Sequence, residues 1–220
     1  MKVGGLLGAS GMVGSLALRQ LIAEENVQRV IAPTRTPLRA NPKVVNPVLP
    51  NLLVLLEMDI WTSVDAVICT LGTTRQKAGS DEAFRRIDRD LPLALARKAR
   101  EMGVPAFGYV SSLGADPKSL FLYSRTKGEV EQALSGMNFP SLTIIRPSLI
   151  SGDRQQSRFM ERAATGFLNV LSPLLPARVR PNRADIIASA LVDRAVNPRA
   201  GQTAIRSKDL GPENSPLQGD

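Results

Sequence analysis

The chain has 220 residues, of which 43% are hydrophobic and 22% charged, and this size and composition fit one globular domain with a single sizeable core. Its net charge of +8 favours anionic ligands, but basic and acidic side chains alternate and aromatic residues make up only 4%, so nucleic-acid binding is not expected. The chain has no histidine, which excludes Ser-His-Asp hydrolysis and imidazole metal ligands, and no metal site is expected.

Apolar strand patterns and helical patterns alternate along the chain. In chain order, the patterns predict a strand over Val3–Leu7, a helix over Met12–Ala23, a strand over Val27–Ala32, a short strand within Val44–Val48, a segment of either type over Leu52–Met58, a strand over Asp65–Leu71, a helix over Asp81–Met102, a strand over Pro105–Ser111, a helix over Tyr123–Ser135, a strand over Leu142–Arg146, helices over Arg158–Leu171 and Arg183–Ala195, and an edge strand over Gln202–Ile205. Repeated strand–helix units imply parallel pairing, so we expect an α/β fold with a doubly wound parallel sheet of the Rossmann type.

The domain organisation follows from the same patterns. We expect one nucleotide-binding domain over residues 1–206, in which the mainly helical part 151–200 covers the substrate. Residues 207–220 are rich in Gly, Pro, Ser and Asp and are expected to form a loose tail.

A glycine-rich loop follows the first predicted strand and precedes the first helix. It reads Gly8-Ala9-Ser10-Gly11-Met12-Val13-Gly14, with a spacing of G-x-x-G-x-x-G. Such glycines permit a tight turn and a close approach of the backbone to a pyrophosphate, while the helix N-terminus presents free N–H groups to the anion. The loop therefore predicts a dinucleotide site formed by Gly8, Ser10, Gly11, Met12, Val13 and Gly14.

The coenzyme is predicted from the residues that follow the second strand. An NAD site usually offers a carboxylate to the ribose there, whereas this chain has Thr34 and Arg35. A guanidinium pairs well with a 2′-phosphate, so NADP(H) is favoured over NAD. Further cofactor contacts are expected from Leu71, Gly72, Thr73, Lys127 and Pro147 at the ends of neighbouring strands and on the helix that follows.

A tyrosine and a lysine lie four residues apart on a predicted helix. Tyr123 and Lys127 share one face of that helix, and an ammonium next to a phenol favours the phenolate. Such a tyrosine can protonate a nascent alkoxide during carbonyl reduction. At the preceding strand end, a hydroxyl of Ser111 or Ser112 can hydrogen-bond the substrate oxygen, and Arg75 and Ser148 are expected near the substrate, although Arg75 is equally placed to contact a cofactor phosphate.

At these residues the chain resembles the short-chain dehydrogenase/reductase superfamily. It is most similar to the atypical branch that contains the Tat-interacting-protein-like oxidoreductases, through Leu71-Gly72-Thr73-Thr74-Arg75-Gln76-Lys77-Ala78-Gly79, Tyr123-Ser124-Arg125-Thr126-Lys127-Gly128-Glu129-Val130-Glu131 and Ile145-Arg146-Pro147. The resemblance covers residues 2–206. It implies that Ser112 is the oxyanion partner, Tyr123 the acid/base and Lys127 its helper.

The chain departs from the superfamily pattern at two places. Ile87-Asp88 stands where the superfamily often has an asparagine in a proton relay, so either Asp88 takes that role or no residue does. The interval from Ser112 to Tyr123 is short, which leaves open whether Ser111 or Ser112 faces the substrate.

Three functions remain open. The first is an NADP(H)-dependent oxidoreductase that reduces a small carbonyl compound, with hydride from the nicotinamide and a proton from Tyr123. The alternative is an NADP(H)-binding regulatory or sensor protein without turnover, and the third is an epimerase or lyase with tightly held coenzyme. An intact Ser-Tyr-Lys set favours the first.

Location and assembly are predicted from absent signals. No apolar stretch reaches the roughly 18 residues of a membrane span, and the loop glycines interrupt a signal-like start, so a cytoplasmic protein without membrane contact is expected. Cys69 lies in an apolar run and is expected to be a small buried hydrophobe. The chain is expected to be a monomer or a homodimer.

Overall fold

A computed structural model describes residues 2–151 and 181–210 of this chain. Its elements, in chain order, are β1 (Val3–Leu7), α1 (Met12–Ala23), β2 (Arg29–Ile31), β3 (Val44–Val45), η1 (Leu52–Leu56), β4 (Ala66–Cys69), α2 (Arg75–Ala78), α3 (Asp81–Arg85), η2 (Arg86–Asp90), α4 (Leu91–Glu101), β5 (Ala106–Val110), α5 (Leu122–Gly136), β6 (Ser141–Arg146), β7 (Ile150–Ser151), β8 (Asn182–Arg183), α8 (Ala184–Val196), β9 (Gly201–Arg206) and η4 (Ser207–Asp209).

The central sheet is parallel and has seven strands in the order β3-β2-β1-β4-β5-β6-β9. The chain first runs outward from β1 to β3 and then returns to β4 on the other side of β1. This reversal confirms the doubly wound Rossmann-type sheet. In such sheets the crevice for a ligand lies at the carboxyl ends of the strands on either side of the reversal, which here are β1 and β4.

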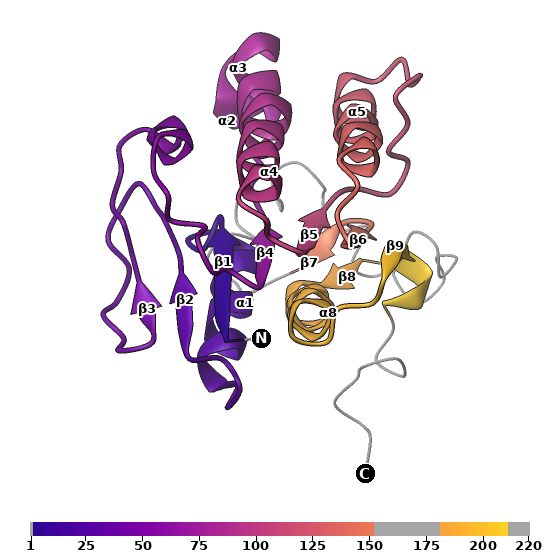
Figure 1. Ribbon diagram of the computed structural model, residues 1–220. Helices are drawn as coiled ribbons and strands as arrows, with labels where there is room; N and C mark the ends of the chain where they lie inside the picture. Colours follow the sequence, from indigo (N-terminus) through magenta and orange to yellow (C-terminus); the bar gives the residue numbers. More distant parts are fainter. Residues whose placement is uncertain (1, 152–180, 211–220) are drawn as a thin grey trace.

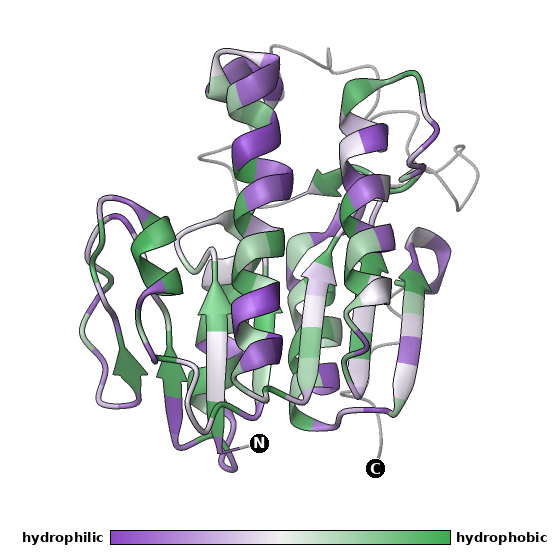
Figure 2. Ribbon diagram, turned by 45° about the horizontal axis from the view of Figure 1, so that its top comes forward, coloured by the Kyte–Doolittle hydropathy of each residue, from purple (hydrophilic) through white to green (hydrophobic). Residues whose placement is uncertain are grey.

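Helices cover both faces of the sheet. In Figure 1, α4 and α5 lie on one face, while α1 and α8 lie on the other. Alternate side chains of each strand enter the two cores: Leu7 and Tyr109 pack with Val130 of α5, whereas Leu6 packs with Ala17 of α1 and Leu191 of α8. Because both faces are buried, the central strands are continuous apolar runs, and Figure 2 shows the hydrophilic residues of α4 and α5 on the surface away from the sheet.

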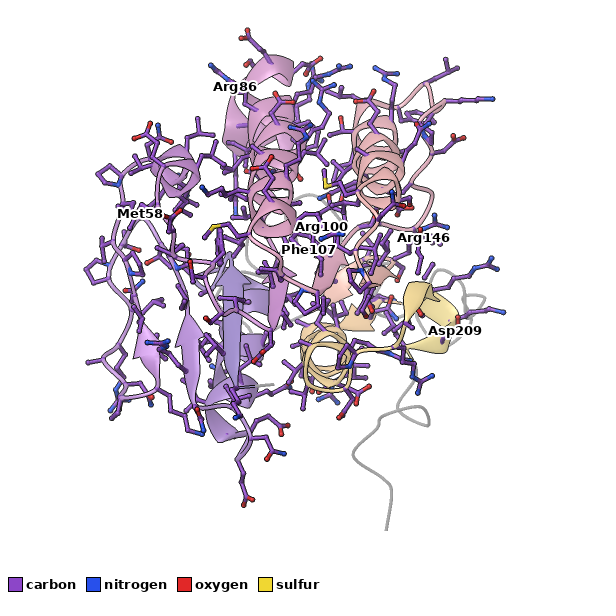
Figure 3. The ribbon with its side chains drawn as sticks, in the orientation of Figure 1. Met58, Arg86, Arg100, Phe107, Arg146 and Asp209 are labelled. Atoms are coloured by element: carbon purple, nitrogen blue, oxygen red, sulfur yellow. The ribbon has the colours of Figure 1, made fainter. Side chains whose placement is uncertain are left out.

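The helix expected over Asp81–Met102 is divided into three segments. Arg86–Asp90 forms a π-helical turn (η2) between α3 and α4. Pro92, in the first turn of α4, has no N–H to donate to the carbonyl group four residues earlier, and this loss interrupts the regular hydrogen-bond pattern. In Figure 3, Arg86 labels the start of η2 and Arg100 labels the last turn of α4.

Other segments differ from the prediction in extent. The third strand is limited to Val44–Val45, and Leu52–Leu56 is a 3₁₀ helix whose first turn is capped by Asn51. In the expected tail, Ser207 and Leu210 are buried, so the packed chain continues to residue 210. The helix expected over Arg158–Leu171 and the tail beyond 210 lie outside the described residues.

The expected substrate-covering part is described only at its end. Helix α8 packs against α1 and the underside of the sheet, so Ala184–Val196 belongs to the core of the nucleotide-binding domain. Within residues 2–151 and 181–210, every helix is too short or too polar to cross a bilayer. No group of three or more metal-ligating side chains is found in the same ranges.

Candidate functional site

The glycine-rich loop forms a tight turn between β1 and α1. Gly8 has a φ of +88°, and the N–H of Gly11 donates to its carbonyl oxygen at 2.9 Å. A Cβ atom on Gly14 would lie 2.1 Å from that same oxygen, so α1 approaches β1 more closely than any other residue at position 14 allows. Helix α1 has no side-chain cap and no acidic residue in its first turn, which leaves its N-terminal N–H groups available to an anion.

The loop after β2 is shaped by one asparagine. The amide nitrogen of Asn46 donates to the carbonyl oxygen of Ala32 at 2.6 Å and to the Thr34 hydroxyl oxygen at 2.8 Å. The Thr34 hydroxyl in turn donates to the carbonyl oxygen of Thr36 at 2.6 Å. Thr34 is therefore buried and structural, while Arg35 between these anchored residues is exposed.

The loop after β4 contains Leu71, Gly72 and Thr73. The N–H of Thr73 donates to Oδ2 of Asp88 at 2.7 Å, which fixes this loop to η2. Arg75, expected near substrate or phosphate, begins α2 and pairs with Asp81 at the surface. The pair is exposed and contributes little to the position of Arg75, so a contact of Arg75 with substrate or with a cofactor phosphate stays a prediction.

Lys127 lies at the centre of a buried cluster of polar groups. Its ammonium nitrogen lies 3.0 Å from Oδ1 of Asp88 and donates to the hydroxyl of Tyr109 at 3.1 Å. Burial by itself lowers the pKa of Lys127, but the charges of Tyr109, Asp88 and Tyr123 outweigh it, and the net shift is upward. Lys127 is thus a buried ammonium, paired with a carboxylate, at the carboxyl ends of β4 and β5.

Tyr123 lies at the edge of this cluster. Its ring centroid is 6.0 Å from the Lys127 nitrogen and 6.0 Å from the ring of Phe84. Tyr123 remains 46% exposed, whereas Tyr109 is fully buried. The helix therefore brings Tyr123 and Lys127 together as the spacing predicts, with the phenol ring of Tyr123 accessible from solvent.

The serine pair after β5 is divided between two environments. The Ser112 hydroxyl donates to the carbonyl oxygen of Leu113 at 3.0 Å. The Ser111 hydroxyl is buried and has no hydrogen-bond partner among the residues that the structure describes. An unsatisfied buried hydroxyl is uncommon and makes Ser111 the serine that needs a partner.

The loop that connects these serines to Tyr123 is held against α5. The N–H of Asp116 donates to the carbonyl oxygen of Ser124 at 3.1 Å. A Cβ atom on Gly128 would lie 2.3 Å from the backbone of Asp116 and Pro117, so Gly128 permits this close contact. The packing shows how the short interval before Tyr123 is accommodated.

The loop after β6 contains Pro147 and Ser148. The carbonyl oxygen of Pro147 accepts from the N–H of Leu113 at 2.7 Å, which joins the loops after β5 and β6. The Ser148 hydroxyl donates to Oδ1 of Asn182 at 3.2 Å, and Asn182 also bonds Ser207. Ser148 is therefore part of a partly buried network that joins the loop after β6 to β8 and to η4.

Two residues that contact Lys127, Tyr109 and Asp88, come from other elements than its own helix. Tyr109 was not expected at the site, although it stands two residues before Ser111 and therefore shares its face of the sheet. Asp88 was expected only as a replacement for an asparagine, and the structure makes it the counter-ion of Lys127. The expected inert cysteine lies below them: Cys69 is buried, and burial raises the pKa of its thiol to about 11.

The sheet order, the glycine-rich loop and the Tyr-Lys helix define a protein with the fold of NAD(P)-binding short-chain dehydrogenases/reductases. Solved structures share this fold. MoeE5 in complex with UDP-glucose and NAD superposes with a TM-score of 0.69 at 17% identity, covering 99% of this chain and 82% of MoeE5. A short-chain dehydrogenase family protein from Francisella tularensis has a TM-score of 0.69 at 14% identity, covering 94% and 98% of the two chains.

Curated relatives narrow the assignment. Protein fmp52, mitochondrial, of Emericella nidulans is 32% identical over 214 residues, which cover 93% of this chain and 92% of that protein. Protein HTATIP2 of Rattus norvegicus is 33% identical over 201 residues, with 90% and 82% covered. No protein-family model matches the chain. The chain belongs to the family of Fmp52 and HTATIP2, which confirms the resemblance to the Tat-interacting-protein-like branch.

The names of the fungal relatives correct one expectation. The Fmp52 proteins of Emericella nidulans, Aspergillus niger and Aspergillus terreus are all called mitochondrial. The cytoplasmic location expected from the sequence is therefore wrong, and these relatives point to the mitochondrion. Absence of an apolar span carries no information about the compartment, which is why the sequence reasoning failed here.

Proposed function

We propose that this protein is an NADP(H)-dependent oxidoreductase that reduces a small carbonyl compound. The observation that carries the proposal is the buried Lys127 ammonium, whose nitrogen lies 6.0 Å from the ring centroid of Tyr123. Both groups lie at the edge of the sheet where the glycine-rich loop follows β1. Burying a charged lysine costs free energy, so such a lysine has a chemical or a structural role. The half-exposed phenol of Tyr123 beside it favours a chemical role.

The residues present fit a dinucleotide. Because Gly14 has no Cβ, α1 can pack closely on the end of β1. The first turn of α1 has no acidic side chain that would repel a diphosphate. Arg35 is exposed on a loop held by Asn46, where a guanidinium can pair with a 2′-phosphate. The exposed cation at position 35 supports NADP(H) over NAD.

The chemistry divides between coenzyme and chain. When bound, the coenzyme supplies the hydride that reduces the substrate carbon. Tyr123 donates its phenolic proton to the carbonyl oxygen, and the Lys127 ammonium stabilises the phenolate that remains. A hydroxyl of Ser111 or Ser112 donates a hydrogen bond to the same oxygen and orients it.

A second candidate is an NADP(H)-binding regulatory protein without turnover. It is favoured by the direct partners of Lys127, which are Asp88 and Tyr109. In that case the buried cluster serves to hold the coenzyme-binding loop and α5 together, and Tyr123 has no proton to transfer.

One experiment separates the two candidates. The protein is incubated with NADPH and a panel of aldehydes and ketones while absorbance at 340 nm is followed, and Tyr123→Phe is assayed in parallel. The oxidoreductase is supported when turnover falls by about a hundredfold or more in Tyr123→Phe while NADPH affinity is retained. Tight NADPH binding with no turnover across the panel supports the regulatory protein.

A further inference from the structure

Asp88 bonds two parts of the site at once. Its Oδ2 accepts the N–H of Thr73 in the loop after β4 at 2.7 Å, and its Oδ1 lies 3.0 Å from the ammonium nitrogen of Lys127 on α5. Asp88 itself comes from the π-helical turn η2 and is fully buried. One carboxylate therefore connects three elements that are distant in the sequence.

The loop after β4 lies directly against this ion pair. A Cβ atom on Gly72 would lie 3.3 Å from Oδ1 of Asp88 and 3.7 Å from the Lys127 nitrogen. Gly72 and Thr73 follow β4 at the crevice where a ligand of this sheet binds. The carboxylate is thus adjacent to the backbone that would receive the coenzyme.

A neutral side chain at position 88 would serve only half of these contacts. An asparagine oxygen can accept the Thr73 N–H, but it leaves the buried ammonium without a negative charge, and a lone buried charge is strongly destabilised. Among residues 2–151 and 181–210, the titratable groups around the Lys127 ammonium are Asp88 from η2, Tyr109 from β5, Tyr123 from α5 and Cys69 from β4. Among them, Asp88 has the lowest ordinary pKa; burial raises that pKa, and the charge of Lys127 and the N–H of Thr73 oppose the rise.

We propose that Asp88 is a positioning residue that keeps Lys127 charged and fixes it to the Thr73 loop, so that the coenzyme-binding loop and the catalytic helix form one rigid unit. The proposal rests on the proposed function only in assigning the loop to the coenzyme. Asp88 acts through Lys127 and Thr73 and does not contact the reacting atoms. This role differs from that of the asparagine relay usual at this position.

The test compares Asp88→Asn with Glu129→Gln in the full-length protein. Glu129 pairs with Arg89 at 2.9 Å and so joins the same two elements, η2 and α5, without contacting Lys127. Side-chain ¹⁵N NMR of lysine, assigned with Lys127→Met, follows the ionisation of Lys127 without coenzyme. In the wild type and in Glu129→Gln, Lys127 should stay protonated up to the alkaline limit of the folded protein, whereas in Asp88→Asn it should lose its proton within that range.

NADPH binding supplies a second readout. The affinity of Asp88→Asn should fall by about tenfold at neutral pH and by more at alkaline pH, whereas Glu129→Gln stays within about twofold of the wild type. If Asp88→Asn does not fold, the test is made instead on Lys127→Met, by measuring hydrogen exchange of the Thr73 amide. Loss of the ammonium should then speed exchange of the Thr73 amide by about tenfold more than Glu129→Gln does.

The outcomes separate the two proposals. An unchanged Lys127 titration in Asp88→Asn, or a Thr73 amide indifferent to Lys127→Met, overturns the role of Asp88 even in an active reductase. A shifted titration in a protein that reduces no carbonyl compound upholds the role of Asp88 and discards the proposed reaction.

Discussion

A methyl group on Gly14 would lie 2.1 Å from the carbonyl oxygen of Gly8, which is closer than any non-bonded carbon–oxygen contact. The same Cβ would lie 2.6 Å from the hydroxyl oxygen of Thr70, which donates to the carbonyl oxygens of Leu7 and Gly8. The first obstacle is backbone directly after β1, and the second is a side chain that two hydrogen bonds hold in place directly after β4. The packing of α1 on the sheet, and the aim of its N-terminus, therefore depend on the missing side chain.

Gly14→Ala should weaken both the fold and coenzyme binding. Moving α1 outward to relieve the clash costs about 1–3 kcal/mol, which lowers the melting temperature by several degrees in a chain of this size. Gly136→Ala is the matched control because a Cβ on Gly136 would meet no atom within 4 Å. Differential scanning calorimetry and NADPH titration check both variants, and an equally stable Gly14→Ala would show that α1 is not held by this contact.

Arg35→Asp tests the coenzyme preference. Replacing the exposed guanidinium by a carboxylate turns an attraction for the 2′-phosphate into a repulsion, and NADPH affinity should fall by about 2 kcal/mol or more, or thirtyfold. Affinity for NADH should change little. Arg97→Asp on the exposed surface of α4 makes the same charge change elsewhere and should leave NADPH binding within about twofold.

Isothermal titration with both coenzymes measures the Arg35→Asp effect. Equal affinity of the wild type for NADPH and NADH would contradict the preference, whatever the variant does. An equal loss with Arg97→Asp would instead reveal a general effect of net charge.

The fold was predictable because its signals are local. The continuous apolar run over Asp65–Leu71 is typical of a strand buried on both faces, and the structure has that strand at Ala66–Cys69, next to β1 and the glycine-rich loop. Strand ends in a parallel sheet share one edge, so the gathering of the glycine-rich loop, Thr73 and Ser111 required no tertiary information.

The electrostatics of the site depend on contacts between distant segments. Helical spacing places Tyr123 near Lys127, but it says nothing of Asp88, whose side chain comes from the π-helical turn that precedes Pro92. In the sequence, Tyr109 resembles the apolar residues of its strand, and only the packing of α5 brings Lys127 to its hydroxyl. The residue patterns carried no information about the cellular compartment.

Tyr109 predicts how stability depends on pH. Burial raises the pKa of this phenol from 10.0 to about 12, although the charge of Lys127 acts in the opposite direction. Between these values the folded chain retains a proton that the unfolded chain has lost, so stability falls as pH rises through this range, by roughly 2–3 kcal/mol in total. Below pH 10 both states are protonated and this contribution is constant.

Urea unfolding of Tyr109→Phe measures the effect. The variant lacks the acceptor for Lys127 and should be less stable than the wild type at pH 8, and this difference should shrink from pH 10 to 12. In Tyr123→Phe, Tyr109 is the remaining tyrosine of the two in the chain, so absorbance at 295 nm reports it alone. A phenolate signal centred near pH 10 in that folded variant would contradict the burial argument.

Glu131 and Arg146 predict a difference between two ion pairs. Nε of Arg146 donates to both carboxylate oxygens of Glu131 at 3.0 Å, and its Nη2 adds a further bond, which joins α5 to the end of β6, where Figure 3 labels Arg146. The Glu131 side chain is only 7% exposed, and Arg146 is 35% exposed, so its solvent contact reduces the value of the pair. Glu131→Gln should lower the free energy of unfolding by roughly 1–2 kcal/mol at neutral pH.

Arg183→Gln is the control variant. It removes an equally well-formed pair with Asp185, but the Arg183 guanidinium is 72% exposed, so the free energy of unfolding should not change measurably. Equal losses in the two variants, measured by urea unfolding at low and high salt, would show that burial does not set the strength of these pairs.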